Sequence, residues 1–380
     1  MGRVGNGWFV AALAAGCLLS PSGASAARSV SVSGNQLVDG GKPIRLIGVN
    51  RSGSEYACAG PVGGGGFGYG IFQGPVSNRT IKAMLGWRIN AVALPLNEAC
   101  WLGGYAPISS RFSGAAYRAA ILDYVSRLNA RGIIVVLRLS GAAPGSGAYG
   151  MDTRSTDEIP MADADHALDF WRSVATTFRD DHQVIFHAFD EPHAIDWPCA
   201  LNGCAANDAP RGRPRFGPYT ATGHQAIVDA IRSTGATQPI DISGIDFAGR
   251  LDQWEQFMPT DPLGQLVVGF NTFDYSGNFA SSKPDLARLA SAHPVLIGGF
   301  GDTNCTSRFS NKVMKFADAT GISYLAWTWN AVQDYGGCSN ALLDSGRKGK
   351  AGRAYLRGLP SGFGRGVRAH FRKVKASKRF

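Results

Sequence analysis

The 380-residue sequence lacks several features that mark common classes of protein. Beyond its first residues it has no apolar run long enough to span a bilayer. Its seven cysteines show no metal-ligand spacing with a nearby pair of histidines, so we expect neither zinc nor another metal. The glycine-rich loop at residues 63–68 satisfies G-x-G-x-x-G but follows no tight strand-to-helix turn, so we expect no cofactor. With 44% hydrophobic and 17% charged residues, the composition is that of a globular protein.

Acidic residues are absent after Asp344, whereas twelve Lys or Arg follow it. The formal net charge of +10 therefore arises in this tail, because the rest of the chain has 26 basic and 28 acidic residues. A near-neutral main domain argues against a nucleic-acid partner, which would need positive charge spread over a binding face. We expect the basic segment 346–380 to be disordered, and either to contact anionic cell-wall polymer or membrane headgroups or only to aid solubility.

Residues 1–26 have the pattern of a secretory signal peptide. An apolar run at residues 8–15 precedes small residues at 24–26, which predicts cleavage near Ala26 and a secreted protein. An uncleaved anchor and a lipoprotein site before Cys17 are the alternatives.

Eight short apolar runs rich in β-branched residues recur along the chain, and helix-like stretches separate most of them. The runs are residues 44–50, 89–96, 133–140, 184–191, 239–245, 266–273, 294–302 and 322–329. Alternating strands and helices predict an α/β protein with one (β/α)8 TIM barrel at residues 27–345, and we expect a monomer. The active site of this fold lies at the carboxyl ends of the strands, where this chain has polar and aromatic residues suited to a sugar cleft.

Loss of the signal segment leaves six cysteines, an even number in an exported chain, which predicts three disulfides. Sequence alone allows fifteen connectivities. The pairs that would each join loops on the same face of the barrel are Cys58/Cys100, Cys199/Cys204 and Cys305/Cys338.

Six segments of the predicted barrel carry a more specific signal, at residues 48–56, 70–75, 95–103, 164–171, 294–302 and 324–330. Among them, residues 95–103 have the sequence PLNEACWLG, residues 294–302 have PVLIGGFGD and residues 324–330 have YLAWTWN. Together they resemble glycoside hydrolase family 5, the cellulase family, whose seventh strand usually ends in Gly-Glu-Phe-Gly. The resemblance spans residues 44–330 and implies a barrel of the retaining β-glycosidase type.

Retaining glycosidases use two carboxyl groups about 5 to 5.5 Å apart, one as proton donor and one as nucleophile. The resemblance places the donor at Glu191, in the Asp-Glu-Pro sequence of residues 190–192, and the nucleophile at Gly299, which has no side chain. Asp190 stands where the family has an Asn that hydrogen-bonds the sugar 2-hydroxyl. A carboxylate could still accept that bond, although it would also raise the pKa of Glu191.

Other catalytic positions of the family are also changed. Its strand-two Arg falls at Ala93, and its His after strand three falls at Ser140. The His and Tyr of its strand six fall at Asn271 and Phe273. The proton donor and Trp327 are the main family residues that remain. Since the framework segments are still readable, the pattern indicates a barrel kept for something other than standard hydrolysis.

The first interpretation is therefore a secreted pseudoglycosidase that binds β-linked polysaccharide or oligosaccharide without cleaving it. The rings expected to stack on sugars are Trp327, Trp329, Trp101 and Trp197. The rings expected in the core are Trp87 and Trp171. The residues expected to hydrogen-bond sugar hydroxyls are Asn50, Asn97, Asp190, Glu191 and Asn271.

Two alternatives remain open. An active, inverting hydrolase would use Glu191 as acid and a relocated carboxylate as base. The candidate bases are Asp302, three residues beyond Gly299, and Asp274 or Asp190, although Asp302 could instead cap a loop. The other alternative is a cell-envelope interaction protein held in place by its basic tail.

Overall fold

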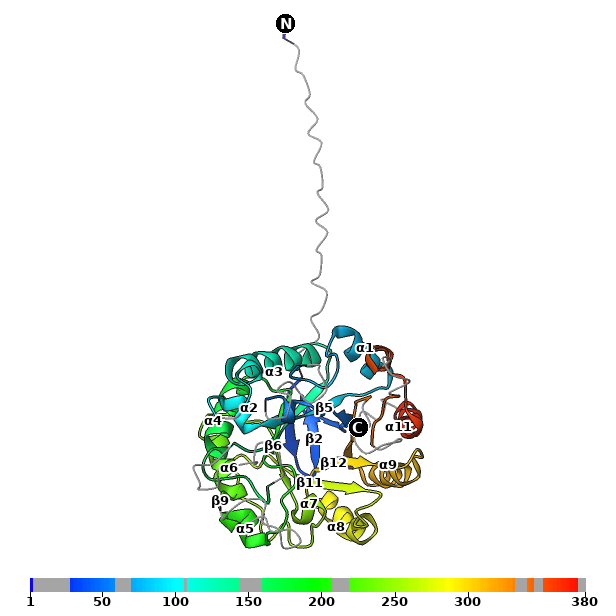
Figure 1. Ribbon diagram of the computed structural model, residues 1–380. Coiled ribbons are helices and arrows are strands. Elements are labelled where there is room, and N and C mark those ends of the chain that lie inside the picture. The colour runs from blue at the N-terminus through cyan, green and yellow to red at the C-terminus, as the bar shows by residue number, and fades with distance from the viewer. Residues whose placement is uncertain are drawn as a thin grey trace.

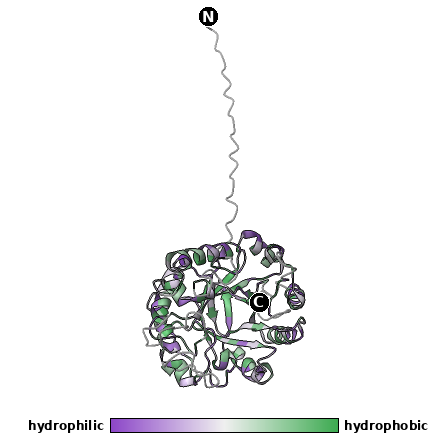
Figure 2. Cartoon of the chain, viewed as in Figure 1, coloured by the Kyte–Doolittle hydropathy of each residue, from purple (hydrophilic) through white to green (hydrophobic). Residues whose placement is uncertain are grey.

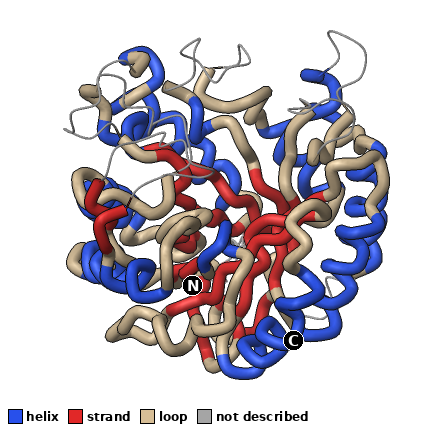
Figure 3. The backbone as a smooth tube through the Cα atoms, turned by 60° about the horizontal axis from the view of Figure 1, so that its bottom comes forward, coloured by secondary structure: helices blue, strands red, loops and turns tan. Residues whose placement is uncertain are grey.

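The computed structural model describes residues 1–2, 28–58, 70–105, 108–143, 159–206, 219–331, 340–344 and 351–374. Eight parallel strands in this part of the chain close into a barrel, and helices surround it (Figures 1 and 3). The barrel strands are β4 (Ile47–Asn50), β5 (Ala91–Asn97), β6 (Ile134–Gly141), β7 (Val184–His187), β10 (Ile240–Ser243), β11 (Leu266–Phe273), β12 (Val295–Gly301) and β13 (Ser323–Ala326). Each overlaps one of the eight apolar runs, so the predicted (β/α)8 barrel is confirmed.

Alternating side chains of these strands pack into two different apolar cores, one inside the barrel and one between the strands and the helices. On β5, Ala91 and Ala93 belong to a cluster inside the barrel, whereas Val92 and Leu94 belong to the larger core between the strands and the helices. Because successive strand side chains point to opposite faces, both faces of a parallel barrel are covered and its strands are apolar throughout.

A small antiparallel sheet covers the amino-terminal end of the barrel. Its strands are β1 (Val30–Ser33), β2 (Gln36–Asp39) and β3 (Lys42–Ile44). Val30 and Leu37 pack with the inward side chains of the barrel strands, and β2 lies over the barrel centre in Figure 1. This end is therefore sealed by apolar side chains, which leaves the carboxyl ends of the strands for a site.

The helices of the outer layer are amphipathic. In α4 (Ala167–Phe178) the buried positions include Phe170, Trp171, Val174 and Phe178, a spacing that places them on one face. Figure 2 shows hydrophobic residues along the strands and hydrophilic residues on the outer helices. Within the described ranges, none of the helices has both the length and the apolar character needed to cross a membrane.

The remaining helices are α1 (Asn78–Gly86), α2 (Glu98–Leu102), α3 (Gly114–Asn129), α5 (Trp197–Asn202), α6 (His224–Arg232), α7 (Ile245–Ala248), α8 (Phe279–Ala292), α9 (Arg308–Thr320), α10 (Ala351–Arg357) and α11 (Gly362–Lys373). The 3-10 helices are η1 (Ser54–Tyr56) and η2 (Ser110–Phe112). A two-stranded sheet of β8 (Cys204–Ala206) and β9 (Tyr219–Ala221) lies outside the barrel.

The prediction that residues 346–380 are disordered is wrong for residues 351–374. Phe363, Val367 and Phe371 recur every four residues on α11, and all are buried. The helix begins with a capped turn, in which Ser361 Oγ accepts a hydrogen bond from the Gly364 amide. His370 Nε2 also lies 2.8 Å from an Asp318 carboxylate oxygen on α9. The prediction failed because it rested on the basic composition of the segment. Three apolar residues at helical spacing are enough to give this helix a buried face.

Helix α10 is likewise part of the main fold, so the domain extends beyond the predicted boundary at residue 345. The Tyr355 hydroxyl accepts a hydrogen bond from the Ala331 amide at 3.1 Å, and the buried Arg51 guanidinium lies 5.1 Å from the Tyr355 ring centre. Trp87 on the loop after α1 donates to the Gly358 carbonyl at 3.0 Å.

Two of the three expected disulfides lie within the described residues. They join Cys58 to Cys100 and Cys199 to Cys204. Cys305 is also disulfide-bonded, whereas Cys338 lies outside the described residues, so the third pairing stays a prediction. Cys58 and Cys100 follow the carboxyl ends of β4 and β5, which confirms that this bridge joins loops on the open face.

Candidate active site

Above the apolar layer, the inward side chains of three neighbouring strands are charged or polar. Arg138 on β6, His187 on β7 and Asp241 on β10 pair with one another in the strand register, and all are buried. Arg138 and His187 each follow an inward apolar residue two positions earlier, so the strand period carries them inside. Sequence reasoning missed all three, although each interrupts an apolar run.

His187 connects this layer to the residues above it. Its Nδ1 lies 3.1 Å from Asp241 Oδ2, and its Nε2 lies 2.7 Å from Ser243 Oγ. Burial raises the pKa of Asp241 to about 8 and lowers the pKa of His187 well below its usual value. Ser243 Oγ also donates to the Asp190 backbone carbonyl at 2.9 Å, so this network supports the loop that carries the expected acid.

Arg138 holds the Asp190 carboxylate. Its Nη1 lies 3.0 Å from Asp190 Oδ1, and its Nη2 donates to the Gly298 carbonyl at 2.9 Å. Ser140 Oγ donates to the other Asp190 oxygen at 3.0 Å. Both oxygens of Asp190 are thus engaged by the protein, which makes this side chain a poor candidate for a relocated base.

Glu191 is held by Asn271, the residue opposite Gly299. Asn271 Nδ2 donates to Glu191 Oε1 at 2.9 Å and is 3.4 Å from Asp190 Oδ1. A bulge in β12 pairs Asn271 with Gly299 across the strands. A Cβ built on Gly299 would lie 3.1 Å from Asn271 Oδ1 and 3.5 Å from the Phe273 ring. The structure therefore places position 299 next to the partner of Glu191, as the resemblance implied.

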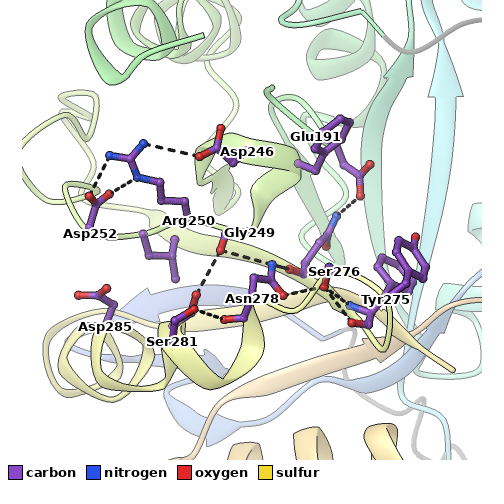
Figure 4. A pocket seen from close by; sticks show the side chains of 15 residues that line it. Glu191, Asp246, Gly249, Arg250, Asp252, Tyr275, Ser276, Asn278, Ser281 and Asp285 are labelled. Carbon is purple, nitrogen blue, oxygen red and sulfur yellow. Dashed lines mark hydrogen bonds and ion pairs between the residues drawn. The ribbon is translucent and has the colours of Figure 1, made fainter. Parts of the chain in front are cut away.

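An open cleft of about 760 Å³ runs from Glu191 across the ends of β10 and β11 (Figure 4). Glu191, Tyr275 and Asn278 line it, together with the ion-paired Arg250 and Asp252. Such a volume, lined by polar and aromatic side chains, is typical of a small-molecule or oligosaccharide site.

Two exposed aromatic rings in this cleft were not predicted as sugar platforms. Phe247 has half of its surface exposed and stacks on His193 with ring centres 4.3 Å apart. Tyr275, also exposed, stacks on Phe273 at 5.4 Å. Phe247 lies within three consecutive residues of positive φ, an arrangement that turns its ring outward from the end of β10. Both rings closely follow a polar residue at a strand end, which is the signal that could have found them.

The tryptophans expected to stack on sugars lie mostly in the core. Trp101, Trp197 and Trp329 are buried, so their predicted roles as platforms are wrong. Trp329 packs edge-on against Trp87 with ring centres 4.9 Å apart. Trp327 is half-buried and stays a candidate platform. The expected core residues Trp87 and Trp171 are confirmed as core.

Asn50 and Asn97 are fully buried and bond to the protein itself, which contradicts their predicted roles as sugar ligands. Asn50 Nδ2 donates to the Gly298 carbonyl at 2.8 Å. Asn97 caps α2 by accepting from the Cys100 amide, and it donates to the Glu55 carbonyl at 2.9 Å. Strand and helix ends leave backbone groups without partners, and an asparagine amide satisfies both donors and acceptors.

Asp302 caps helix α9 and is not placed as a base. Its two carboxylate oxygens accept from the amides of Phe309 and Ser310 at 3.1 and 3.0 Å. The side chain is buried, and this burial raises its pKa. Asp274 is similarly engaged, because its oxygens accept from Thr303 and Asn304. The loop-capping interpretation of Asp302 holds and its role as a relocated base is wrong.

One cluster of possible metal ligands was also missed. Glu98, Asp163 and His166 each offer a ligand atom, and these atoms lie within 4.8 Å of one another. No local pattern could have predicted this cluster, because Glu98 lies 65 positions or more from the other two residues in the sequence.

The family model for cellulase (glycosyl hydrolase family 5) matches residues 50–333. The chain belongs to this family. Endoglucanase 1 of Robillarda sp. (strain Y-20) is 25% identical over 219 residues, and the chain spans about half the length of this relative (51%).

Solved structures share the fold of this glycosyl hydrolase family 5 chain. Cellulase Cel5C_n superposes with a TM-score of 0.61 at 18% identity, covering 92% of this chain and 94% of that one. The β-glucanase SdGluc5_26A from Saccharophagus degradans, in complex with cellotetraose, superposes with a TM-score of 0.62 at 16% identity, covering 90% and 93%.

Proposed function

We propose that this cellulase-family barrel is an exported β-glucan-binding protein that does not carry out retaining hydrolysis. The observation that carries the proposal is the position of Gly299. It lies beside Asn271, the partner of Glu191, where the family has its nucleophile. Without a carboxylate there, no covalent glycosyl-enzyme can form, and the loss of one member of a catalytic pair removes most of the rate.

The surrounding residues support binding without cleavage. Asp190 is held by Arg138 and Ser140, and Asp302 caps a helix, so neither offers a carboxylate to activate water. Ala93, at the family's strand-two Arg, is buried in the apolar layer of the barrel. The buried Arg138 is held by Asp190 and the Gly298 carbonyl.

A glucan chain would lie along the cleft between the two exposed aromatic rings. The apolar faces of glucose rings stack on aromatic side chains, which Phe247 and Tyr275 offer, while Glu191, Asn271 and Asn278 supply hydrogen bonds to hydroxyls. The half-buried Trp327, which follows β13, is the third ring that we propose as a platform.

The test is binding and turnover of cellotetraose by the same preparation. We expect saturable binding in calorimetry and no cleavage products by chromatography after prolonged incubation. Tyr275→Ala should weaken binding by about two- to thirteenfold, because one aromatic stacking contact contributes about 0.5–1.5 kcal/mol. Leu263→Ala serves as the matched control, since Leu263 is exposed but precedes β11 at the opposite end of the barrel.

Cleavage with retention of configuration would refute the proposal outright. Cleavage with inversion would favour an active hydrolase in which Glu191 acts with another carboxylate. Absence of binding to any β-linked oligosaccharide would leave the barrel without its proposed ligand and would equally refute it.

The exposed side of α11 favours a second, weaker contact. Arg365, Arg372 and Lys373 are exposed on this helix, and no acidic residue follows Asp344 to offset them. We propose that this side adsorbs to anionic cell-wall polymer, which would hold the exported protein near its glucan.

A further inference from the structure

We propose that Glu98, Asp163 and His166 form a binding site for a divalent transition cation, Zn²⁺ or Mn²⁺, that fastens two loops beside the cleft. Glu98 begins α2 after strand β5, and the other two residues precede α4. Their ligand atoms all lie within 4.8 Å of one another. Three ligand atoms at about 2.0–2.2 Å from one ion lie at most about 4.4 Å apart, so side-chain shifts of a few tenths of an ångström would bring this cluster to bonding distance.

The burial of the cluster is the second observation. The Glu98 and Asp163 side chains are fully buried, and the His166 side chain is 17% exposed. Among the described residues, Asp163 Oδ2 receives no hydrogen bond, and His166 Nδ1 makes no hydrogen bond and lies 3.5 Å from Asp163 Oδ1. A buried carboxylate oxygen without a hydrogen-bond donor, close to an imidazole nitrogen and a second carboxylate, is a group that a cation would satisfy.

Hydrogen bonds and a ring contact hold these three side chains in place. Glu98 Oε2 accepts from the Ala143 amide at 3.0 Å, and Asp163 Oδ1 accepts from the His166 amide at 2.7 Å. The Tyr105 ring meets the His166 ring edge-on with centres 5.0 Å apart. Interactions of this kind between ligand side chains and their neighbours orient metal ligands and tune metal affinity.

The ligand types select the class of ion. One imidazole with two carboxylates suits zinc or manganese, whereas calcium takes six to eight oxygen ligands and magnesium keeps most of its waters. The partly exposed side of His166 offers a path for the ion and room for water to complete its coordination.

The site would act on the cleft through a short segment. Asp163 follows Pro160 by three residues, and the Pro160 carbonyl accepts from the His193 amide at 2.9 Å. His193 in turn stacks on Phe247, a cleft residue. Fastening the Asp163 loop therefore steadies one wall of the cleft without contacting a bound sugar.

The experiment uses the full chain, stripped with a chelator and then titrated separately with Zn²⁺, Mn²⁺ and Ca²⁺. Bound metal is measured by mass spectrometry and calorimetry, and the unfolding temperature is recorded with and without metal. We expect one Zn²⁺ or Mn²⁺ per chain and a higher unfolding temperature. His166→Gln and Asp163→Asn should each weaken the dissociation constant by at least about tenfold. His293→Gln, which alters a half-buried His paired with Glu255, should leave it unchanged.

The unmodified chain gives a readout that does not depend on how the variants fold. Bound Co²⁺ in the Zn²⁺ position should show visible absorption that Zn²⁺ abolishes by competition. Absence of binding by all three probes, binding of Ca²⁺ alone, or binding that His166→Gln and Asp163→Asn leave intact while they remain folded by circular dichroism would each overturn the assignment. Absence of all metal binding would indicate that the carboxyl groups of Glu98 and Asp163 share a proton instead.

Discussion

Asn271 links the two halves of the candidate site at the level of single residues. Its amide nitrogen donates to Glu191, while its amide oxygen faces Gly299 and has no donor among the described residues. A group introduced at position 299 would therefore meet an acceptor oxygen and the apolar edge of the Phe273 ring. Neither neighbour stabilises a negative charge.

Gly299→Glu is accordingly expected not to restore hydrolysis. The new carboxyl would have a raised pKa and would be a poor nucleophile at neutral pH, because its surroundings disfavour the ionised form. Arg138 cannot supply the missing charge without leaving Asp190 and the Gly298 carbonyl. The measurement is release of products from cellotetraose, with Gly299→Gln as the control of equal size. Activity in the Glu variant above that of the Gln variant would show that only the nucleophile is missing.

Sequence reasoning located Glu191, Gly299 and Asn271 correctly relative to one another, because the strand ends of a barrel converge on one face. It failed where burial decides the role. Asn50 and Asn97 lie at strand ends as expected, but their amides satisfy backbone groups. Whether a polar residue at a strand end faces the cleft or the backbone depends on contacts between distant segments, which no local pattern specifies.

The eight strands could be predicted because each overlaps an apolar run, although β4, β7, β10 and β13 have only 4 residues each and are shorter than their runs. Helix α11 could not be predicted from composition, since basic residues outnumber the three aromatic and aliphatic residues that bury it. The apolar face of Phe363, Val367 and Phe371 is buried only because helix α9 and strand β13 lie beside it. The Phe371 ring, for example, contacts the ring of Tyr324 on β13, and the ring centres are 6.0 Å apart.

Phe371→Ala should therefore destabilise the whole barrel and not merely loosen a tail. Removing a buried Phe costs about 3–5 kcal/mol of unfolding free energy, because a cavity remains where the ring was. The change is measured by urea unfolding, with tryptophan fluorescence as the readout. Arg372→Ala, one residue along on the exposed side, should change the free energy by no more than about 0.5 kcal/mol. Equal stabilities of the Phe371 variant and the parent would mean that α11 does not contribute to the fold.

The buried Glu55 in helix η1 predicts a pH dependence of stability. Burial raises its pKa to about 8, whereas the unfolded chain titrates near 4.5, so the folded state holds a proton that the unfolded state loses. The contribution of this proton is complete below about pH 4.5 and is lost as pH rises to about 8. Its slope is about 1.4 kcal/mol per pH unit.

Glu55→Gln should remove this slope, because the amide oxygen can still accept from the Gly53 amide at 2.6 Å and does not titrate. Unfolding free energies of the variant and the parent are compared at pH 5, 6 and 7, and the variant should gain relative stability as pH rises. Glu255→Gln, at an exposed position, should run parallel to the parent. Parallel curves for Glu55→Gln as well would show that Glu55 is ionised in the folded protein.

The distribution of charge over the whole molecule separates its two proposed contacts. The part of the chain up to Asp344 is almost neutral, and the exposed cations of α11 follow it. Glucans carry no charge, so stacking and hydrogen bonding in the cleft should depend little on salt, whereas adsorption of a basic helix to an anionic polymer should be screened.

We therefore expect the dissociation constant for cellotetraose to change by less than about twofold between 50 and 500 mM NaCl, because the Debye length matters only for charged partners. Adsorption to an anionic cell-wall polymer should fall steeply over the same range and should be reduced in a variant carrying Arg365→Gln, Arg372→Gln and Lys373→Gln. The same variant should bind cellotetraose like the parent, since α11 packs on α9, and no residue of either helix lines the cleft. A glucan affinity that falls with salt, or in the triple variant, would mean that one surface serves both ligands and that the cleft is not an independent site.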